Sequence, residues 1–304
     1  MCVRPPMKFP ALLQPGSRVA LVAPAGPLRD ETDLERAMAS VRSCDWEPVV
    51  GAHVLERDGY LAGTDAHRLG DLNKFAADPT IDGIWCIRGG YGTMRLLDGI
   101  DYDAWQRNPK PLIGYSDITA LHAAIGQRAA LITFHGPTAR AELTTFSRAS
   151  LRCAVTDGTD SAGTATDAST LQPGRAEGRL VGGNLALVAS LIGTRYEPSF
   201  DGAILVLEDV NESVYRLDRM FTQLRLSGAL DQLAGIALGQ FTEIPDESAA
   251  DSRPLLDLLY EVADQCAVPC VANLPIGHTG EQWTIPLGAT AELDADSKTL
   301  MVIR

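Results

Sequence analysis

The chain has 304 residues, of which 45% are hydrophobic and 21% are charged, a composition typical of a globular protein with room for two modest domains. Its formal net charge is −13. An acidic balance of this size argues against a nucleic acid or an anionic membrane as the main partner, because both are bound through basic patches.

The first residues carry no apolar stretch behind a basic start, so Cys2 lacks the context of a secretory or lipoprotein signal. The longest apolar run, residues 185–192, is far shorter than the ~20 residues of a membrane-spanning helix. The cysteines are scattered, and only Cys266 and Cys270 are close together, without a second pair or a histidine nearby. We therefore expect a cytoplasmic protein with reduced thiols, no metal site and no cofactor.

Strand and helix patterns alternate in the first half of the chain. Crossover helices between strands indicate a parallel sheet covered on both faces, hence an α/β fold. The expected strands are 18–23, 48–54, 83–87, 111–115 and 130–134, and the expected helices are 30–44, 65–77 and 116–126.

Residues 156–178 are rich in turn formers and have no periodicity, so they are expected to link one domain, 1–155, to a second, 179–304. The second half mixes strands with helices and ends in a predicted β-hairpin. Its expected strands are 203–207 and 235–241, its helices follow residue 184 and cover 213–226 and 254–265, and the hairpin falls within 284–303.

Ser116 is the first candidate for chemistry. It lies where a predicted strand meets a helix, two residues after Gly114, and a sharp turn there would raise its hydroxyl above the carboxyl end of the sheet. A nucleophile elbow usually has a second glycine two residues later, but this chain has Ile118. The alternative is that Ser116 only caps the helix.

A serine nucleophile also needs a base, and local context leaves two histidines open. His135 ends a predicted strand, and His278 lies in a loop between glycines that would allow another segment to approach closely. Of the others, His53 and His67 lie in polar segments, and His122 lies within a helix. His135 and His278 could each instead be a structural histidine.

Two further features end predicted strands. Glu208 and Asp209 follow an apolar strand, where a carboxylate could orient the base, and Asp209 also suits an N-cap for the helix near Ser213. The loop at residues 88–92 (RGGYG) exposes backbone N–H groups that could hold an oxyanion or simply form a tight turn. It matches neither a Walker loop nor a dinucleotide-binding motif.

Several segments together resemble the muropeptide L,D-carboxypeptidase family of serine peptidases, which also contains the microcin-immunity hydrolases. They occur in the family's order and span nearly the whole chain. The matching segments are 16–26 (GSRVALVAPAG), 87–92 (IRGGYG), 112–117 (LIGYSD), 133–137 (TFHGP), 178–185 (GRLVGGNL), 207–210 (LEDV) with 216–219 (RLDR), and 274–278 (LPIGH).

The resemblance implies a catalytic triad of Ser116, Glu208 and His278, with the N–H groups of Gly90 and Asp117 as the oxyanion hole. His135 then becomes structural. The family fold is an N-terminal flavodoxin-like domain followed by a smaller β-rich α/β domain, with the site at their junction. The implied reaction is acyl transfer through Ser116, followed by hydrolysis of the acyl-enzyme.

The family's substrate is a murein tetrapeptide that loses its terminal D-Ala during cell-wall recycling, whereas the sister activity cleaves a peptidyl-nucleotide amide. Residues 215–219 (YRLDR) and 88–92 resemble the first branch more closely. Arg88 is our candidate for binding the substrate carboxylate, on position alone.

Family members are often homodimers. The rival reading is a non-enzymatic ligand-binding protein, whose Ser116 a fluorophosphonate would not label.

Overall fold

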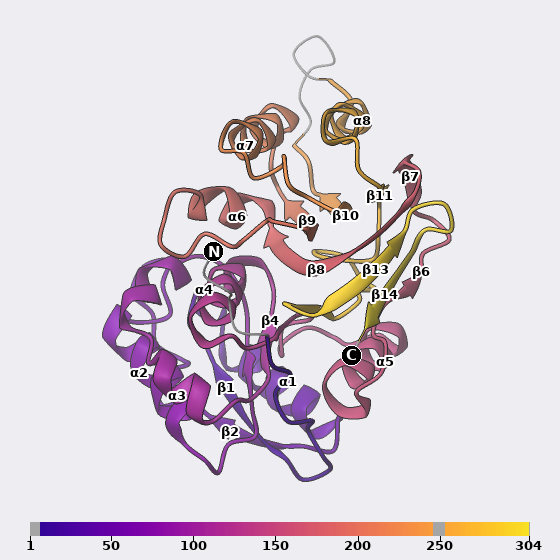
Figure 1. Ribbon diagram of the computed structural model, residues 1–304. Helices are drawn as coiled ribbons and strands as arrows, with labels where there is room; N and C mark the ends of the chain where they lie inside the picture. Colours follow the sequence, from indigo (N-terminus) through magenta and orange to yellow (C-terminus); the bar gives the residue numbers. More distant parts are fainter. Residues whose placement is uncertain (1–6, 246–252, 304) are drawn as a thin grey trace.

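The computed structural model describes residues 7–245 and 253–303, which form two α/β domains (Figure 1). Cys2 lies outside the described residues. The first domain is built on a mostly parallel sheet and the second on a mixed sheet. The expected α/β fold class is therefore confirmed.

The first sheet has the strand order β2-β1-β3-β4-β5-β12. Its first five strands are parallel, and the order 2-1-3-4-5 is that of flavodoxin-like folds, in which ligands bind beyond the carboxyl ends of the strands. The strands are β1 (Arg18–Val22), β2 (Glu47–Val50), β3 (Gly83–Cys86), β4 (Leu112–Gly114), β5 (Thr133–His135) and the antiparallel β12 (Ile285–Leu287).

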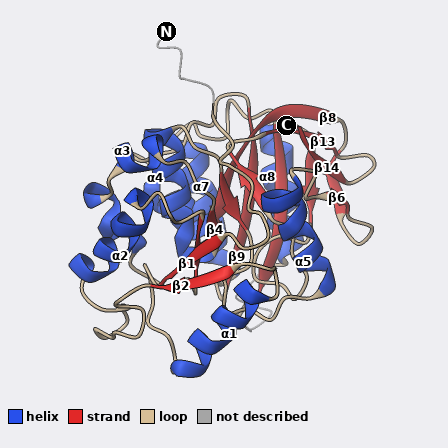
Figure 2. Ribbon diagram, turned by 90° about the horizontal axis from the view of Figure 1, so that it is seen from below, coloured by secondary structure: helices blue, strands red, loops and turns tan. Residues whose placement is uncertain are grey.

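Alternating side chains divide this sheet between two helical layers, because successive residues of a strand face opposite sides. Val19 and Leu21 of β1 pack in one core with α1 (Glu31–Arg42) and α5 (Thr145–Arg152). Ala20 and Val22 pack on the other side. That side is covered by α2 (Asp65–Ala77), α3 (Tyr102–Arg107) and α4 (Thr119–Ala129), which lie together in Figure 2.

The second sheet has the order β6-β14-β13-β8-β9-β10-β11-β7, and its strands β8 to β11 are parallel neighbours. Its helices α6 (Leu185–Leu191), α7 (Val214–Leu226) and α8 (Leu255–Cys266) cover one face. The strands are β6 (Gly163–Thr164), β7 (Ser169–Gln172), β8 (Arg175–Asn184), β9 (Ala203–Val210), β10 (Gly235–Thr242), β11 (Cys270–Ala272), β13 (Thr290–Asp294) and β14 (Thr299–Ile303).

Two expected segments differ from the structure. Residues 156–178 are not a bare connection, because they contain β6, β7 and the start of β8, which pair within the second sheet. The predicted hairpin consists of β13 and β14 alone, while β12 crosses over and pairs with β5 of the first sheet. The boundary between the two domains stays a prediction.

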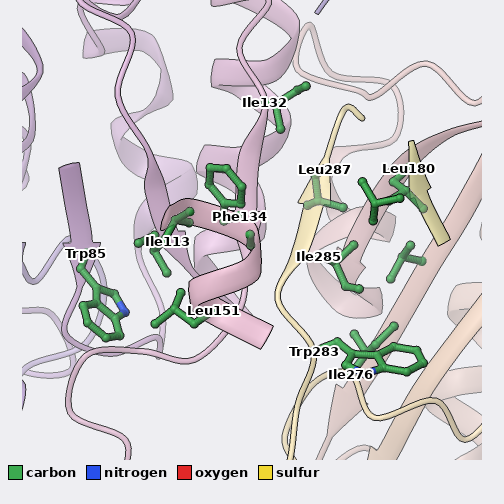
Figure 3. Close-up of a cluster of buried hydrophobic side chains, with 14 of the residues drawn as sticks. Trp85, Ile113, Ile132, Phe134, Leu151, Leu180, Ile276, Trp283, Ile285 and Leu287 are labelled. Carbon is green, nitrogen blue, oxygen red and sulfur yellow. The ribbon is translucent and has the colours of Figure 1, made fainter. Parts of the chain in front are cut away.

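The free face of the second sheet packs against the first domain in one continuous core (Figure 3). Phe134 and Leu151 of the first domain share this core with Leu180, Ile276 and Ile285 from the second half of the chain. A core of this kind resists compression and holds its parts at set distances. Residues contributed by the two domains are therefore held in a defined relative position at their junction.

Candidate active site

Ser116 lies in a sharp turn beyond the end of β4. It opens a single 3₁₀ turn, Ser116–Ile118, and its φ is 64°. This left-handed conformation is costly for a residue with a Cβ, and such strain is concentrated at functional sites. Gly114 is needed before the turn, because a Cβ there would lie 3.1 Å from both Cys86 Cβ and Ile118 Cγ1. The turn has the geometry of a nucleophile elbow despite Ile118.

The glycine-rich loop after β3 lies against this serine. A Cβ on Gly89 would come within 2.8 Å of Ser116 Cβ and 3.0 Å of its Oγ. At the far end of the loop, Thr93 N–H donates to the buried Asp117 carboxylate at 2.8 Å. Burial raises the pKa of Asp117, while the Thr93 N–H opposes that shift. The loop and the elbow are thus joined on both sides of the serine.

This contact gives a first prediction. Replacing Gly89 with alanine should displace Ser116 and lower kcat about a hundredfold, since a misplacement near 1 Å can cost that much. Gly89 does not have a positive φ, so the fold should survive. The matched control is Gly70→Ala on α2, where a Cβ meets nothing within 4 Å. Steady-state rates and thermal melting of both variants would test this, and unchanged kcat in Gly89→Ala would contradict the close packing.

The second domain contributes a histidine–carboxylate pair. His278 Nδ1 lies 2.7 Å from Glu208 Oε2, and the Glu208 side chain is fully buried at the end of β9. Gly277 has φ 101°, and a Cβ there would lie 2.4 Å from Glu208 Oε2. The glycine beside His278 therefore allows the close approach that the sequence predicted. The contact keeps the proton on Nδ1, so Nε2 remains as the basic nitrogen.

Tyr115 connects the two halves of the candidate site. Its ring centroid lies 4.7 Å from that of His278, and Ser116 is the next residue along the chain. Within residues 7–245 and 253–303, no hydrogen bond joins Ser116 Oγ to His278. Such contacts are often long before substrate binds. The structure thus brings Ser116, Glu208 and His278 to one junction, with His278 paired with Glu208 and packed against Tyr115, the residue before Ser116.

The other buried histidines have different surroundings. His135 is fully buried, neither ring nitrogen has a hydrogen-bond partner, and burial lowers its pKa well below the usual value. His122 Nε2 donates to the Gly114 carbonyl at 2.8 Å, beneath the elbow, and burial lowers its pKa to about 4. Among residues 7–245 and 253–303, no carboxylate is hydrogen-bonded to either ring. Within the same residues, only His278 combines partial exposure, a carboxylate partner and contact with Tyr115, which precedes Ser116.

Asp209 has a capping role, but at a different helix from the one expected. Its carboxylate accepts from Ala186 N–H at 2.9 Å, in the first turn of α6, and from the Asn184 side chain at 2.8 Å. Ser213 begins α7 without a side-chain cap. Burial raises the pKa of Asp209 to about 6. The sequence could not reveal this partner, because α6 precedes Asp209 and lies beside it only through the pairing of β8 with β9.

Arg88 lies beside the glycine-rich loop and is half-buried. Its Nη1 donates to the Pro27 carbonyl at 2.7 Å, and a Cβ on Gly90 would lie 3.7 Å from its Nη2. Burial lowers the pKa of Arg88, and the neighbouring Arg140 adds to that effect. Arg140 contacts the buried Asp33 at 3.5 Å, and its Nε has no hydrogen-bond partner. Sequence reasoning did not single out Arg140, because it lies in a loop without a motif.

A cavity of about 300 Å³ lies elsewhere at the domain junction, between α4, β8 and α6. Its lining includes Thr119, His122 and Arg179, but not Ser116, Glu208 or His278. The three candidate catalytic residues therefore do not line this cavity.

Comparison with known proteins agrees with this architecture. Residues 19–136 match the model of the LD-carboxypeptidase N-terminal domain, and residues 177–293 match that of the C-terminal domain. A putative carboxypeptidase of Streptomyces coelicolor is 42% identical, covering 97% of this chain and 96% of its own. The murein tetrapeptide carboxypeptidase of Pseudomonas aeruginosa is 37% identical, and the alignment covers 92% of this chain and 94% of that protein.

Among solved structures, the wild-type microcin C7 self-immunity protein in its apo state superimposes with a TM-score of 0.89 at 26% identity, covering 99% of both chains. Across the described residues, the helices are too short or too polar to cross a membrane.

The fold and the two family domains define a hydrolase built from two α/β domains. The chain belongs to the LD-carboxypeptidase family, peptidase family S66, which includes the microcin self-immunity proteins. The resemblance inferred from its sequence motifs is thereby confirmed.

Proposed function

We propose that this enzyme is a serine L,D-carboxypeptidase that releases the terminal D-Ala from murein tetrapeptides, with Ser116, Glu208 and His278 as its catalytic triad. The observation that carries the proposal is the pairing of His278 Nδ1 with the buried Glu208 at 2.7 Å, together with the contact of the His278 ring with Tyr115, the residue before Ser116 on its strained turn. A nucleophile, its base and the group that orients the base are the parts that acyl transfer requires.

In the proposed reaction, His278 takes the proton of the Ser116 hydroxyl as Oγ attacks the scissile carbonyl. The tetrahedral intermediate then collapses, the C–N bond breaks, and His278 returns the proton to the departing amine of D-Ala. Water, activated by the same imidazole, hydrolyses the acyl-enzyme and frees Ser116. Glu208 holds the imidazole in the correct tautomer and stabilises its charge while it carries two protons.

The N–H groups of Gly90 and Asp117 are the proposed oxyanion donors. Within the part of the chain that is described, neither N–H donates to a backbone or side-chain acceptor. Both belong to the elbow and to the loop packed against it, which are tied together through Thr93 and Asp117. Donors fixed in advance at the position of the developing charge are worth several kcal/mol, about 2.7–4 for one such group.

The substrate carboxylate requires a cation, and two arginines are available. Arg88 remains the proposed contact, because its Nη2 lies beside Gly90 and therefore near the proposed oxyanion donors. Arg140 is the second candidate, since its Nε–H has no partner among the described residues. A charge-assisted hydrogen bond from either would fix the end of the peptide.

The choice of murein peptide over a microcin-like conjugate rests on relatives and motifs. The Pseudomonas aeruginosa relative named for murein tetrapeptides is 37% identical over 298 residues, compared with 30% over 287 residues for the microcin C7 self-immunity protein of Escherichia coli. A cytoplasmic role in peptidoglycan recycling follows from this substrate and forms part of the proposal. Whether the enzyme is a homodimer stays a prediction.

Substrate specificity tests the proposal. Tetrapeptides ending in D-Ala should be cleaved, whereas the same peptide ending in L-Ala, or amidated at its C-terminus, should be cleaved poorly. Loss of a charge-assisted contact costs about 1.5–3 kcal/mol, or about ten- to a hundredfold in kcat/KM. Steady-state rates on the three peptides would measure this. Equal rates would show that neither chirality nor carboxylate is recognised, and would favour the amide hydrolase of the microcin branch.

A further inference from the structure

Two histidines and a glutamate converge on the segment between β2 and α2, a combination that the sequence did not predict. His53 and Glu56 lie in the loop after β2, and His67 lies in the first turn of α2. One ligand atom from each residue lies within 4.8 Å of the others. The two imidazole rings are stacked, with centroids 4.3 Å apart and an interplanar angle of 16°. None of the three belongs to the proposed triad.

Each imidazole is held by a carboxylate through Nδ1. His53 Nδ1 lies 2.9 Å from Asp71 Oδ1, and His67 Nδ1 lies 2.6 Å from Glu56 Oε2. Asp71 is nearly buried, and its second oxygen accepts the backbone N–H of His53 at 2.9 Å. Histidines that bind metals usually have such a partner, which sets the ring orientation and leaves the lone pair on Nε2, and Asp71 fills this role for His53. Glu56 is itself a potential ligand, so the exposed His67 would turn out of the stack and exchange its hydrogen bond with Glu56 for a shared contact with the ion.

The cluster is also accessible. The side chains of His53, Glu56 and His67 are 32%, 39% and 46% exposed, so a cation can reach them from solvent. Two imidazoles and one carboxylate suit Zn²⁺ and similar transition-metal ions, whereas Mg²⁺ and Ca²⁺ prefer sites built from oxygen alone. With these three protein ligands, the fourth position of a tetrahedral ion would remain open to water.

We propose that His53, Glu56 and His67 bind one transition-metal ion of the Zn²⁺ class, with Asp71 as the residue that positions His53. This proposal departs from the expectation, based on the scattered cysteines, that the chain has no metal site. It arises from ligands 3 and 11 residues apart on a loop and a helix, a spacing that matches no zinc motif.

The site would restrain a segment that contacts the glycine-rich loop. Tyr60 packs edge-on against Tyr91 with centroids 5.4 Å apart, and Ala62 N–H donates to the Ala25 carbonyl at 2.9 Å. A bound ion would join this segment to the start of α2. Its role is therefore to stabilise the surroundings of the loop that carries Gly90, and the ion takes no part in the proposed acyl transfer.

Titration of chelator-treated full-length protein with Zn²⁺, measured by calorimetry or against a chromophoric chelator, tests the proposal. Wild-type protein should bind one equivalent at neutral pH, and excess Mg²⁺ should not compete. His53→Asn and His67→Asn should each weaken binding by about a hundredfold or more, and Asp71→Asn by about ten- to a hundredfold. Asp58→Asn, an exposed carboxylate of the same loop outside the cluster, should bind as the wild type does.

Thermal melting supplies a second readout. Zn²⁺ should raise the melting temperature of the wild type and of Asp58→Asn, but not that of His67→Asn, because an ion bound only to the folded state stabilises it. His67 is exposed, so this variant should fold even where His53→Asn does not. The proposal is overturned by the lack of saturable binding to the wild type. It is equally overturned if His67→Asn binds Zn²⁺ undiminished, which would assign the ion to other groups such as the cysteines.

Discussion

Replacing Ser116 with alanine is expected to abolish turnover while leaving the fold and substrate binding largely intact. Loss of a triad nucleophile removes the covalent route but not the surrounding site, and costs on the order of 10⁴ or more in kcat. The measurements are kcat on a tetrapeptide substrate, the affinity for the tripeptide product as an inhibitor, and thermal melting.

A matched control for this variant is Ser190→Ala, which removes an exposed hydroxyl from α6 that donates to the Ala186 carbonyl and, among the described residues, to no other group. It should keep the full wild-type kcat. If Ser116→Ala retained as much as a tenth of the activity, the nucleophile would have to be a different residue.

His278→Ala should be as damaging as Ser116→Ala, whereas His135→Ala should lose activity only in proportion to lost stability. His278 is paired with Glu208 beside Tyr115, while His135 is buried without a carboxylate partner. Triad members act as a unit, so the double variant Ser116→Ala/His278→Ala should be little worse than either single variant.

The comparison requires kcat per folded molecule, obtained from initial rates together with the folded fraction from melting curves. Additive losses in the double variant would mean that the two residues act in separate steps. A larger kcat effect for His135→Ala than for His278→Ala would assign the base to β5 instead.

The first domain could be predicted well from the sequence because its strands are short, apolar and separated by amphipathic helices. α2 was predicted with its observed bounds, and the observed order β2-β1-β3-β4-β5 is that of the flavodoxin-like fold that the family resemblance implied. Local periodicity does not reveal which sheet a strand joins. Residues 285–287 therefore looked like part of a hairpin, although they pair with β5.

The turn-rich segment 156–178 was the other weak point. Its strands β6 and β7 are short and occupy the sheet's edges, where few apolar residues are needed. Gly163, Gly174 and the intervening polar residues resemble a linker in composition. What makes them strands is pairing with β14 and β11, which follow more than 90 residues later in the chain. Such long-range contacts leave no signal in local sequence.

The candidate site was predictable only in part from the residues themselves. Strand-end positions identified Ser116 and Glu208, but the choice of His278 over His135 came from resemblance to the family. The structure supplies an independent reason, the contact of His278 with Glu208. Arg140 and the cluster of His53, Glu56 and His67 could not be found in this way, because tertiary folding of loops brings them together.

The most direct test of the account is mass spectrometry of a purified murein tetrapeptide, with diaminopimelate followed by a terminal D-Ala, after incubation with the enzyme. The account predicts two products, the corresponding tripeptide and free D-Ala, formed by the wild type and by Ser190→Ala but not by Ser116→Ala. A tetrapeptide left intact by the wild-type enzyme, or cleaved at a different bond, would contradict the proposed L,D-carboxypeptidase activity.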